Sequence, residues 1–234
     1  MTDSLASSPI RTVSAPVAVR CKGVLFDMDG ILISSLGSVE RSWHAWAVAR
    51  GVDPALAIHT AHGSRAIETV AKPRPDLDDQ AELKFIEDLE AADVEGIAVL
   101  PGVRELLAAL PAECWTIVTS ATERLARIRM AAGALAVPER IITADQVTHG
   151  KPNPEPYLKG AEILGLAAAD CVVFEDSPSG TKAGRAAGCN VIGTLFSHPV
   201  AELAAAHFLV ADLTGVRVEV LPEELVLRFT PLAI

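Results

Sequence analysis

Aromatic side chains are scarce in this chain: they make up 4% of its 234 residues, although half of all residues are hydrophobic. Alanine, leucine, valine and isoleucine must therefore do most of the packing in a core of ordinary size. The sequence also has no apolar stretch long enough to cross a bilayer, so we expect no membrane partner.

Signals for export are missing as well. Residues 1–19 are rich in serine, alanine and proline and lack the basic and long apolar segments of a secretory signal, so we interpret them as a flexible tail. The four cysteines are far apart, with no C-x-x-C pair: Cys21, Cys114, Cys171 and Cys189. We expect buried free thiols rather than disulfides or zinc ligands, and a cytoplasmic location.

Basic residues are outnumbered: 20 lysines and arginines stand against 30 aspartates and glutamates, which gives a formal charge of −10. An acidic surface disfavours nucleic acid and anionic membranes as partners. It also repels an anionic substrate. A phosphate-binding site in this chain must therefore be made attractive locally, by a metal ion, a lysine or backbone amides.

Short apolar runs are the main structural signal that is present. They are β-branched, bounded by turn residues and separated by helical stretches, and they fall at residues 24–26, 116–119, 140–143, 171–174 and 190–193. This alternation predicts an α/β fold, with a Rossmann-like parallel sheet covered by helices on both faces. In such sheets, ligands bind beyond the carboxyl ends of the strands.

Residues 34–100 interrupt this alternation. Apolar residues there recur at helical spacing, which predicts helices through residues 39–47, 64–71 and 79–92 and no convincing strand. We therefore expect a core domain formed by residues 20–33 and 101–234, with an all-helical domain of residues 34–100 inserted after the first strand. Ser34 would cap the first of these helices.

Polar side chains follow four of the predicted strands, at the edge where ligands bind. They comprise carboxylates, a hydroxyl and a lysine: Asp27 and Asp29, Ser120, Lys151, and Glu175 with Asp176. Carboxylates brought together repel one another, and a hard divalent cation such as Mg²⁺, which prefers oxygen ligands, relieves that repulsion.

This combination of groups suits phosphoryl transfer. An ionised aspartate is a usable nucleophile, and a second aspartate two residues later can protonate the leaving group and then activate water. Lys151 and the Ser120 hydroxyl are suited to stabilising charge on the transferred group. Thr119 is the weaker hydroxyl candidate, because we expect it to remain in the strand.

Four segments carry a resemblance to a known family: FDMDG, IVTSAT, GKPNPEPY and VFEDSPSGTKAGRAAG. In this order and at these strand ends, they resemble the haloacid dehalogenase superfamily of phosphohydrolases. The resemblance implies that Asp27 is the nucleophile and Asp29 the general acid and base. It also implies that Asp27, Asp29, Asp176 and Glu175 hold Mg²⁺, with Asp29 contributing its backbone carbonyl.

The resemblance extends to the substrate side of the site. It implies that Ser120 and the amide of Ala121 hold the phosphoryl group, and that Lys151 is the catalytic lysine. It implies further that the helical insert is a mobile cap that closes over the substrate, with Gly63 and Arg65 as substrate-binding residues.

Within the superfamily, the chain resembles glycerol-phosphate and 2-deoxyglucose-6-phosphate phosphatases and, more distantly, β-phosphoglucomutase. The expected function is Mg²⁺-dependent hydrolysis of a small phosphorylated sugar or polyol by a monomeric enzyme. The alternative is a sugar phosphomutase of the β-phosphoglucomutase kind, which returns the phosphoryl group to a sugar. A phospho-receiver module is disfavoured by the roughly 65-residue helical insert.

Overall fold

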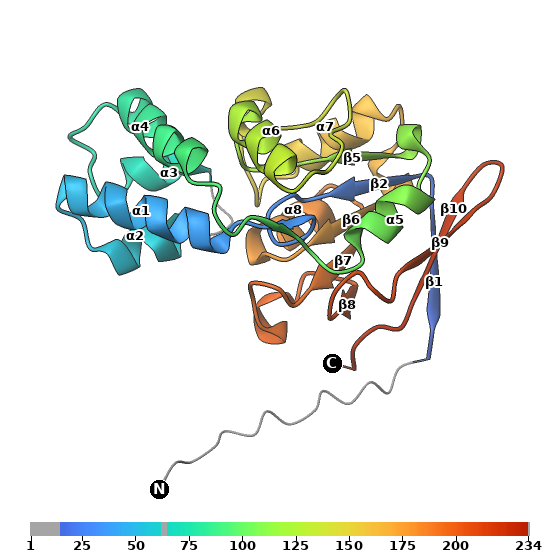
Figure 1. Ribbon diagram of the computed structural model, residues 1–234. Coiled ribbons are helices and arrows are strands. Elements are labelled where there is room, and N and C mark those ends of the chain that lie inside the picture. The colour runs from blue at the N-terminus through green and yellow to red at the C-terminus, as the bar shows by residue number, and fades with distance from the viewer. Residues whose placement is uncertain (1–14, 62–64, 234) are drawn as a thin grey trace, which may run out of the picture.

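A five-stranded parallel sheet forms the centre of the molecule in the computed structural model, which describes residues 15–61 and 65–233 (Figure 1). Its strand order is β5-β2-β6-β7-β8. The strands span Trp115–Ile117 (β5), Gly23–Phe26 (β2), Cys171–Glu175 (β6), Asn190–Thr194 (β7) and Phe208–Val210 (β8). All four pairs of neighbouring strands are parallel, which confirms the predicted fold class.

Helices cover both faces of this sheet, because the strands are apolar on both sides. Val24 and Phe26 of β2 face one cluster of buried residues, whereas Leu25 between them faces another. Helices α5 (Val103–Ala109) and α6 (Glu123–Ala132) pack in the first cluster, and α7 (Glu155–Ile163) and α8 (Pro178–Ala186) in the second. Four 3₁₀ turns lie between these elements, at Ala112–Cys114, Ala144–Gln146, Ala168–Asp170 and Val200–Glu202.

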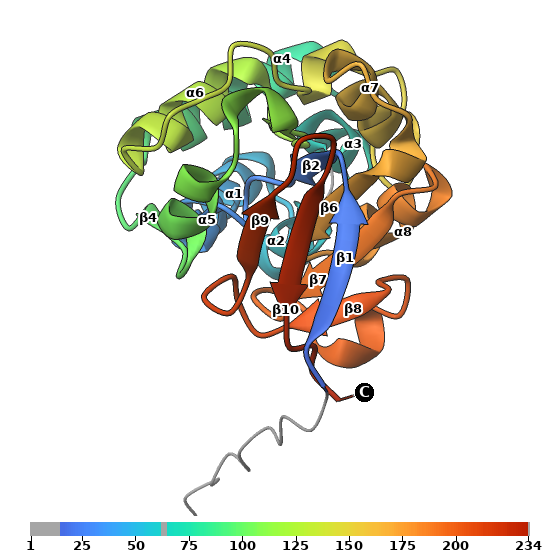
Figure 2. The ribbon, with the colours of Figure 1, turned by 90° about the vertical axis from the view of Figure 1, so that its right-hand side faces the viewer.

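A second, antiparallel sheet extends the first cluster (Figure 2). Its order is β1-β10-β9, with β1 at Val17–Cys21, β10 at Leu225–Phe229 and β9 at Arg217–Val220. The assignment of residues 17–19 to a tail was therefore wrong, since they pair with β10, whereas residues 1–14 lie outside the described part of the chain. The pairing partner is some 200 residues away in the sequence, so local composition did not reveal this strand.

The insert, which we define as residues 36–92, contains helices α1 (Leu36–Arg50), α2 (Pro54–Ala61), α3 (Ala66–Ala71) and α4 (Asp79–Ala92). It has its own buried cluster, in which Trp43 and Trp46 meet edge to face at 5.5 Å. A two-stranded ribbon joins it to the core, formed by β3 (Ile33–Ser34) and β4 (Ala98–Val99). Neither this ribbon nor α2 was predicted from the sequence, because both are short.

Two local predictions need correction. Residues 140–143 do not form a strand: only Ile142 makes a bridge, to Val118, so the run ends against β5 without extending the sheet. Ser34 lies in β3 and does not cap a helix. The residue that precedes α1 is Ser35, whose hydroxyl donates to Asp29 instead of capping the helix.

All four cysteines are free thiols, as expected; three of them are buried, whereas Cys114 is only partly buried. Among residues 15–61 and 65–233, no helix combines the length and the apolar character that a membrane span requires.

Candidate active site

A cavity of about 310 Å³ opens at the carboxyl ends of β2, β5 and β6. Residues that follow these strands form one wall, among them Asp27, Ser120 and Asp176. The insert supplies the opposite wall, with Trp43 from α1 and Glu87 from α4. The volume is at the small end of the range for ligand pockets and fits a small metabolite.

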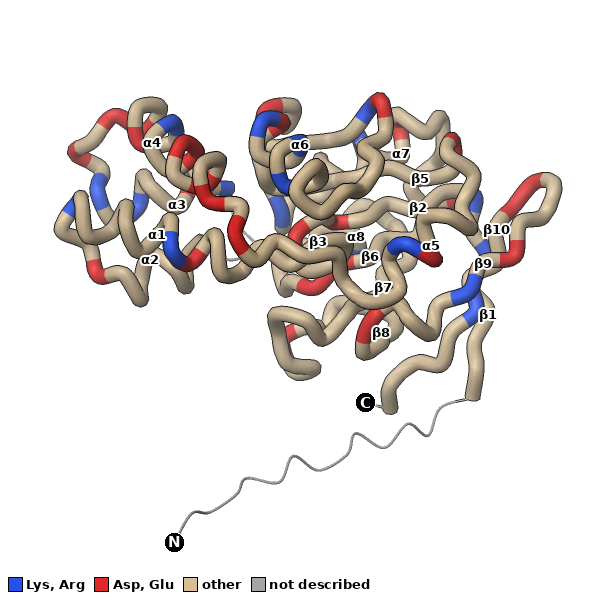
Figure 3. Tube along the Cα trace, viewed as in Figure 1, with Lys and Arg blue, Asp and Glu red and all other residues tan. Residues whose placement is uncertain are grey.

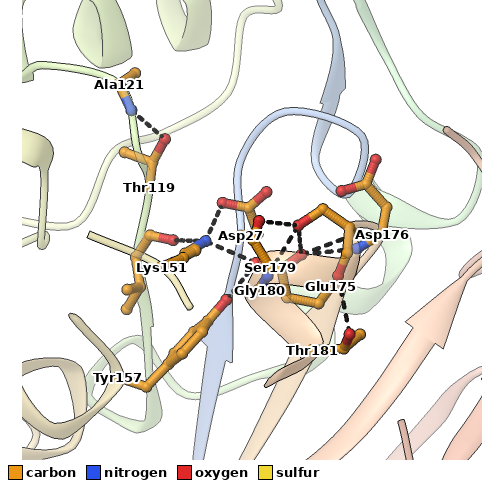
Figure 4. A network of polar contacts seen from close by, with 12 residues as sticks. Asp27, Thr119, Ala121, Lys151, Tyr157, Glu175, Asp176, Ser179, Gly180 and Thr181 are labelled. Atoms are coloured by element: carbon orange, nitrogen blue, oxygen red, sulfur yellow. Dashed lines mark hydrogen bonds and ion pairs between the residues drawn. The ribbon is translucent and has the colours of Figure 1, made fainter. Parts of the chain in front are cut away.

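Asp27 lies at the base of this cavity, directly after β2 (Figure 4). Its backbone N–H donates to the carbonyl of Phe174 in β6 at 3.0 Å, which fixes the backbone at the end of the sheet. Burial raises the pKa of its carboxyl to about 7, because desolvation and the nearby Glu175 outweigh the opposing effect of Lys151. Additional positive charge in the cavity would return this carboxyl to its ionised, nucleophilic form.

Lys151 provides the positive charge closest to Asp27. Its Nζ donates to Asp27 Oδ1 at 2.7 Å, to Glu175 Oε1 at 2.7 Å and to the carbonyl of Val118 at 3.0 Å (Figure 4). Burial alone would lower the pKa of Lys151, but the two carboxylates outweigh it and raise this pKa above its usual value. The lysine therefore remains a cation with all three donors used.

Glu175 is fully buried, and both of its oxygens already accept hydrogen bonds. Oε1 accepts from Lys151 and from the Tyr157 hydroxyl, each at 2.7 Å. Oε2 accepts from the backbone N–H groups of Asp176 and Ser177 and from the Ser177 hydroxyl, at 3.0–3.1 Å. These contacts hold Glu175 beneath Lys151, which it positions.

The acidic groups of the site fit a divalent cation. Oxygens of Asp27, Glu175 and Asp176 lie within 4.8 Å of one another. Burial raises the pKa of Asp176, and the charges of Glu175 and Asp27 raise it further, because three acids gather there around a single lysine. Gly30 is required for this approach: at φ +82°, a Cβ there would lie 1.8 Å from Asp176 Oδ2. Hard oxygen donors with excess negative charge are the set that Mg²⁺ prefers.

Asp29 lies two residues after Asp27 and also lines the cavity. Ser35 donates to its Oδ1 at 2.5 Å, and Arg129 donates to its Oδ2 at 3.0 Å. Arg129 in turn forms an ion pair with Glu90 of α4 at 3.4 Å. The carboxylate of Asp29 is therefore held at both oxygens, by Ser35, which precedes α1, and by Arg129 of α6.

The loop after β5 forms the remaining wall. Thr119, Ser120, Ala121 and Thr122 all line the cavity. The backbone N–H of Ala121 donates to the Thr119 hydroxyl at 3.1 Å, which makes this amide a member of the loop's own network. Thr122 precedes the first residue of α6, so Ser120 lies in the loop two residues before this N-cap, where it lines the cavity.

Arg65 also lines the cavity, but its guanidinium is engaged. It pairs with Glu68 at 2.5 and 2.8 Å and donates to the carbonyl of Val147 at 3.3 Å. Its side chain lies against Gly150, where a Cβ would be 2.7 Å from Nε. Arg65 thus links the insert to the loop that carries the lysine, while the other expected insert residue, Gly63, lies outside the described residues.

Several polar residues of this site were not predicted from the sequence, among them Arg129 and Tyr157. Arg129 lies on the same buried face of α6 as Leu125 and Met130, so a charged residue at an apolar helix position was the available signal. Tyr157 is the single tyrosine of the chain. Its place in the GKPNPEPY segment gave no indication of a contact with Glu175.

Comparison with known proteins gives a consistent result. The haloacid dehalogenase-like hydrolase family matches residues 21–188. Hexitol phosphatase A of Escherichia coli is 44% identical over 182 residues, which cover 74% of this chain and 83% of that protein. Glycerol-1-phosphate phosphohydrolase 1 of Saccharomyces cerevisiae is 35% identical over 190 residues, 76% of each chain.

A solved structure shows the same architecture. A hydrolase from Pseudomonas syringae superimposes with a TM-score of 0.72 at 25% identity, over 82% of this chain and 94% of that one. The family match spans all four segments on which the resemblance was based, and residues of all four line the cavity that contains Asp27. The chain is an enzyme of the haloacid dehalogenase-like hydrolase family.

Proposed function

We propose that this enzyme hydrolyses the phosphate monoester of a small sugar or polyol through an aspartyl phosphate on Asp27. The observation that carries this proposal is the placement of Asp27 in the cavity, 2.7 Å from Lys151 and beside Asp176. A nucleophile, a fixed cation and a cluster suited to a metal ion meet there, and phosphoryl transfer requires positioning and charge neutralisation above all.

In the first step, an Asp27 oxygen attacks phosphorus and the bond from phosphorus to the leaving oxygen breaks. Asp29, in its protonated form, gives its proton to that oxygen, so the alcohol leaves neutral. In the second step, the Asp29 carboxylate takes a proton from water, and the resulting hydroxide attacks the aspartyl phosphate. Inorganic phosphate leaves, and Asp27 and protonated Asp29 are restored.

The residues that would hold Mg²⁺ are Asp27, Asp176 and the backbone carbonyl of Asp29. When bound, the ion supplies positive charge that keeps Asp27 ionised and offsets the charge of the phosphoryl group. Lys151 would add positive charge beside the phosphoryl group, and Ser120 would donate to one of the phosphoryl oxygens. The amide of Ala121 already donates to Thr119, so we assign it to shaping this loop. Because both oxygens of Glu175 accept hydrogen bonds already, we assign it to holding Lys151 rather than to the metal.

We infer the substrate class from the wall of the cavity that the insert forms, called the far wall below, and from the named relatives. Gln80 and Glu87 of α4 offer polar groups beside the apolar Trp43 and Leu83, a combination suited to a polyhydroxylated chain. The named functions of the two curated relatives, a hexitol phosphatase and a glycerol-1-phosphate phosphohydrolase, agree with a polyol phosphate. We propose that the enzyme acts as a monomer in the cytoplasm, where its four thiols would remain reduced.

A sugar phosphomutase is the alternative, and it would have to hold a second phosphate at the far end of the cavity. Among the described residues, the lysine and arginines that line the cavity are Arg65, Arg129 and Lys151, and each is already paired with a carboxylate. The far wall instead carries Glu87 and Glu90. This charge distribution favours a monophosphate and hydrolysis.

The test is phosphate release from hexitol phosphates, glycerol 1-phosphate and hexose 6-phosphates, with and without Mg²⁺. We expect Mg²⁺-dependent release that Asp27→Asn abolishes, with the circular dichroism spectrum unchanged because asparagine has the same shape. Retained turnover in Asp27→Asn would refute the aspartyl phosphate. Isomerisation of a hexose 1-phosphate without net phosphate release would establish the mutase instead.

A further inference from the structure

Arg129 joins the core of the enzyme to the insert at the active site. It belongs to α6, it is 4% exposed, and it lines the cavity. One arm of its guanidinium reaches Asp29 of the core, and the other reaches Glu90 of the insert, at 3.0 and 3.4 Å. Glu90 is equally buried, whereas Asp29 faces the cavity, so a buried ion pair of Arg129 and Glu90 ends on a carboxylate of the active site.

The bridge is part of a wider charged contact between α4 and α6. Figure 3 shows acidic segments of α4 facing basic segments of α6. A second ion pair crosses the same contact, from Arg124 to Asp88 at 2.7 Å, but both of its side chains are more than 40% exposed. Of these two pairs, only Arg129–Glu90 is buried and linked to Asp29.

A guanidinium is a planar fork that holds a carboxylate most firmly with two parallel hydrogen bonds. In this structure, Arg129 gives Asp29 only one of them, because its other arm faces Glu90. If α4 moved away from α6, Glu90 would leave and both arms could close on Asp29. The carboxylate would then be drawn toward α6 and away from a leaving group in the cavity.

We propose that Arg129 is a positioning residue that makes the orientation of Asp29 depend on contact between the insert and the core. With α4 against α6, Glu90 shares the guanidinium and Asp29 faces the substrate. With α4 displaced, Arg129 holds Asp29 away from the substrate, so Asp29 transfers protons only when α4 packs against α6. This inference rests on the proposed role of Asp29 as acid and base.

The test compares Glu90→Gln and Arg129→Lys with Asp88→Asn, which removes the exposed ion pair of the same contact. The probes are p-nitrophenyl phosphate, whose leaving group needs no proton, and glycerol 1-phosphate, whose leaving group needs one. For Glu90→Gln and Arg129→Lys, we expect kcat on glycerol 1-phosphate to fall about tenfold or more with KM nearly unchanged. The burst of p-nitrophenolate should keep its wild-type rate, and Asp88→Asn should resemble the wild type on both esters.

Equal losses on both esters, or no loss in either variant, would overturn the positioning role. Hydrogen–deuterium exchange gives a readout that does not depend on turnover. Deuterium uptake by the backbone amides of β3, β4 and α4 should rise more in Glu90→Gln than in Asp88→Asn. Equal uptake in the two variants would contradict a coupling of the insert to the core through Glu90. If the wild type released no p-nitrophenolate with Mg²⁺, the proposed function would fail, while the exchange comparison would still decide whether Glu90 couples the insert to the core.

Discussion

At the level of single residues, the site depends on glycines that let the acidic side chains approach the backbone closely. Gly30 turns the chain out of β2 with φ +82° and leaves room for Asp176. Gly180 leaves room for Glu175, because a Cβ at Gly180 would lie 1.6 Å from Glu175 Oε1. The acids can therefore gather around Lys151 only because these two positions have no side chain. Gly30 and Asp176 come from separate segments of the chain, so the requirement at Gly30 is a tertiary one, whereas Gly180 and Glu175 belong to the consecutive elements α8 and β6.

Gly30→Ala should weaken Mg²⁺ binding about tenfold or more, because the new methyl group displaces Asp176. The left-handed backbone would also cost about 1–2 kcal/mol of stability. Isothermal titration with Mg²⁺ measures the first effect and thermal unfolding the second. The matched control is Gly96→Ala, where φ is +78° and a Cβ would meet nothing within 4 Å. It should lose similar stability but keep its Mg²⁺ affinity, and an equal loss of affinity in both variants would contradict the role of Gly30.

At the scale of elements, the loop before α7 sets the position of Lys151. Glu155, the first residue of α7, accepts hydrogen bonds from the backbone N–H groups of Thr148 and His149, each at 2.8 Å. These bonds, with an ion pair to Lys159 at 2.9 Å, lower the pKa of Glu155 to about 2. The helix end and the loop are therefore tied together by one ionised side chain.

Glu155→Gln should destabilise the protein in a pH-dependent way. The folded pKa of about 2 lies below the unfolded value of 4.5, so the ionised group stabilises the fold above about pH 4.5. That contribution is lost as the pH falls from 4.5 toward 2. The melting temperature of the variant should therefore be below that of the wild type at pH 7, and the difference should shrink at acidic pH.

The control for this measurement is Glu162→Gln, an exposed position on the same helix. Its melting temperature should follow the wild type across the whole pH range. A gap between wild type and Glu155→Gln that stayed constant down to pH 3 would show that the charge of Glu155 does not stabilise the loop.

At the scale of the whole molecule, the antiparallel sheet completes the core. Leu225, Leu227 and Phe229 of β10 belong to the same buried cluster as Phe26 and Phe174 of the central sheet. Strands β1, β9 and β10 thus cover one face of the central sheet, and none of their residues lines the cavity. Their contribution should be to stability and not to chemistry.

Leu227→Ala should cost about 2–5 kcal/mol of unfolding free energy, because Leu227 is fully buried and alanine leaves a cavity. Urea unfolding measures this cost. Val220→Ala in neighbouring β9, where the valine is 52% exposed, should change stability by less than about 0.5 kcal/mol. Turnover per folded molecule should be unchanged in both, and a stable Leu227→Ala variant would show that this sheet is not part of the core.

The parallel sheet and the gathering of Asp27, Asp29, Lys151 and Asp176 at one cavity could be predicted from the sequence alone. The three aspartates follow short apolar runs that form strands, and the ends of parallel strands meet at one edge of the sheet. Lys151 lies in a loop, and it reaches Asp27, 124 residues away, because its Nζ also donates to the carbonyl of Val118, which follows β5 beside β2.

The pairing of these groups depends on the tertiary structure. The hydrogen bonds of Lys151 and Tyr157 to Oε1 of Glu175, the link from Arg129 to Glu90 and the pairing of β1 with β10 involve residues far apart in the chain. Their local sequences carry no mark of the partner. Burial and charge pairing arise when elements pack together, and a single sequence specifies them only through the fold that it forms.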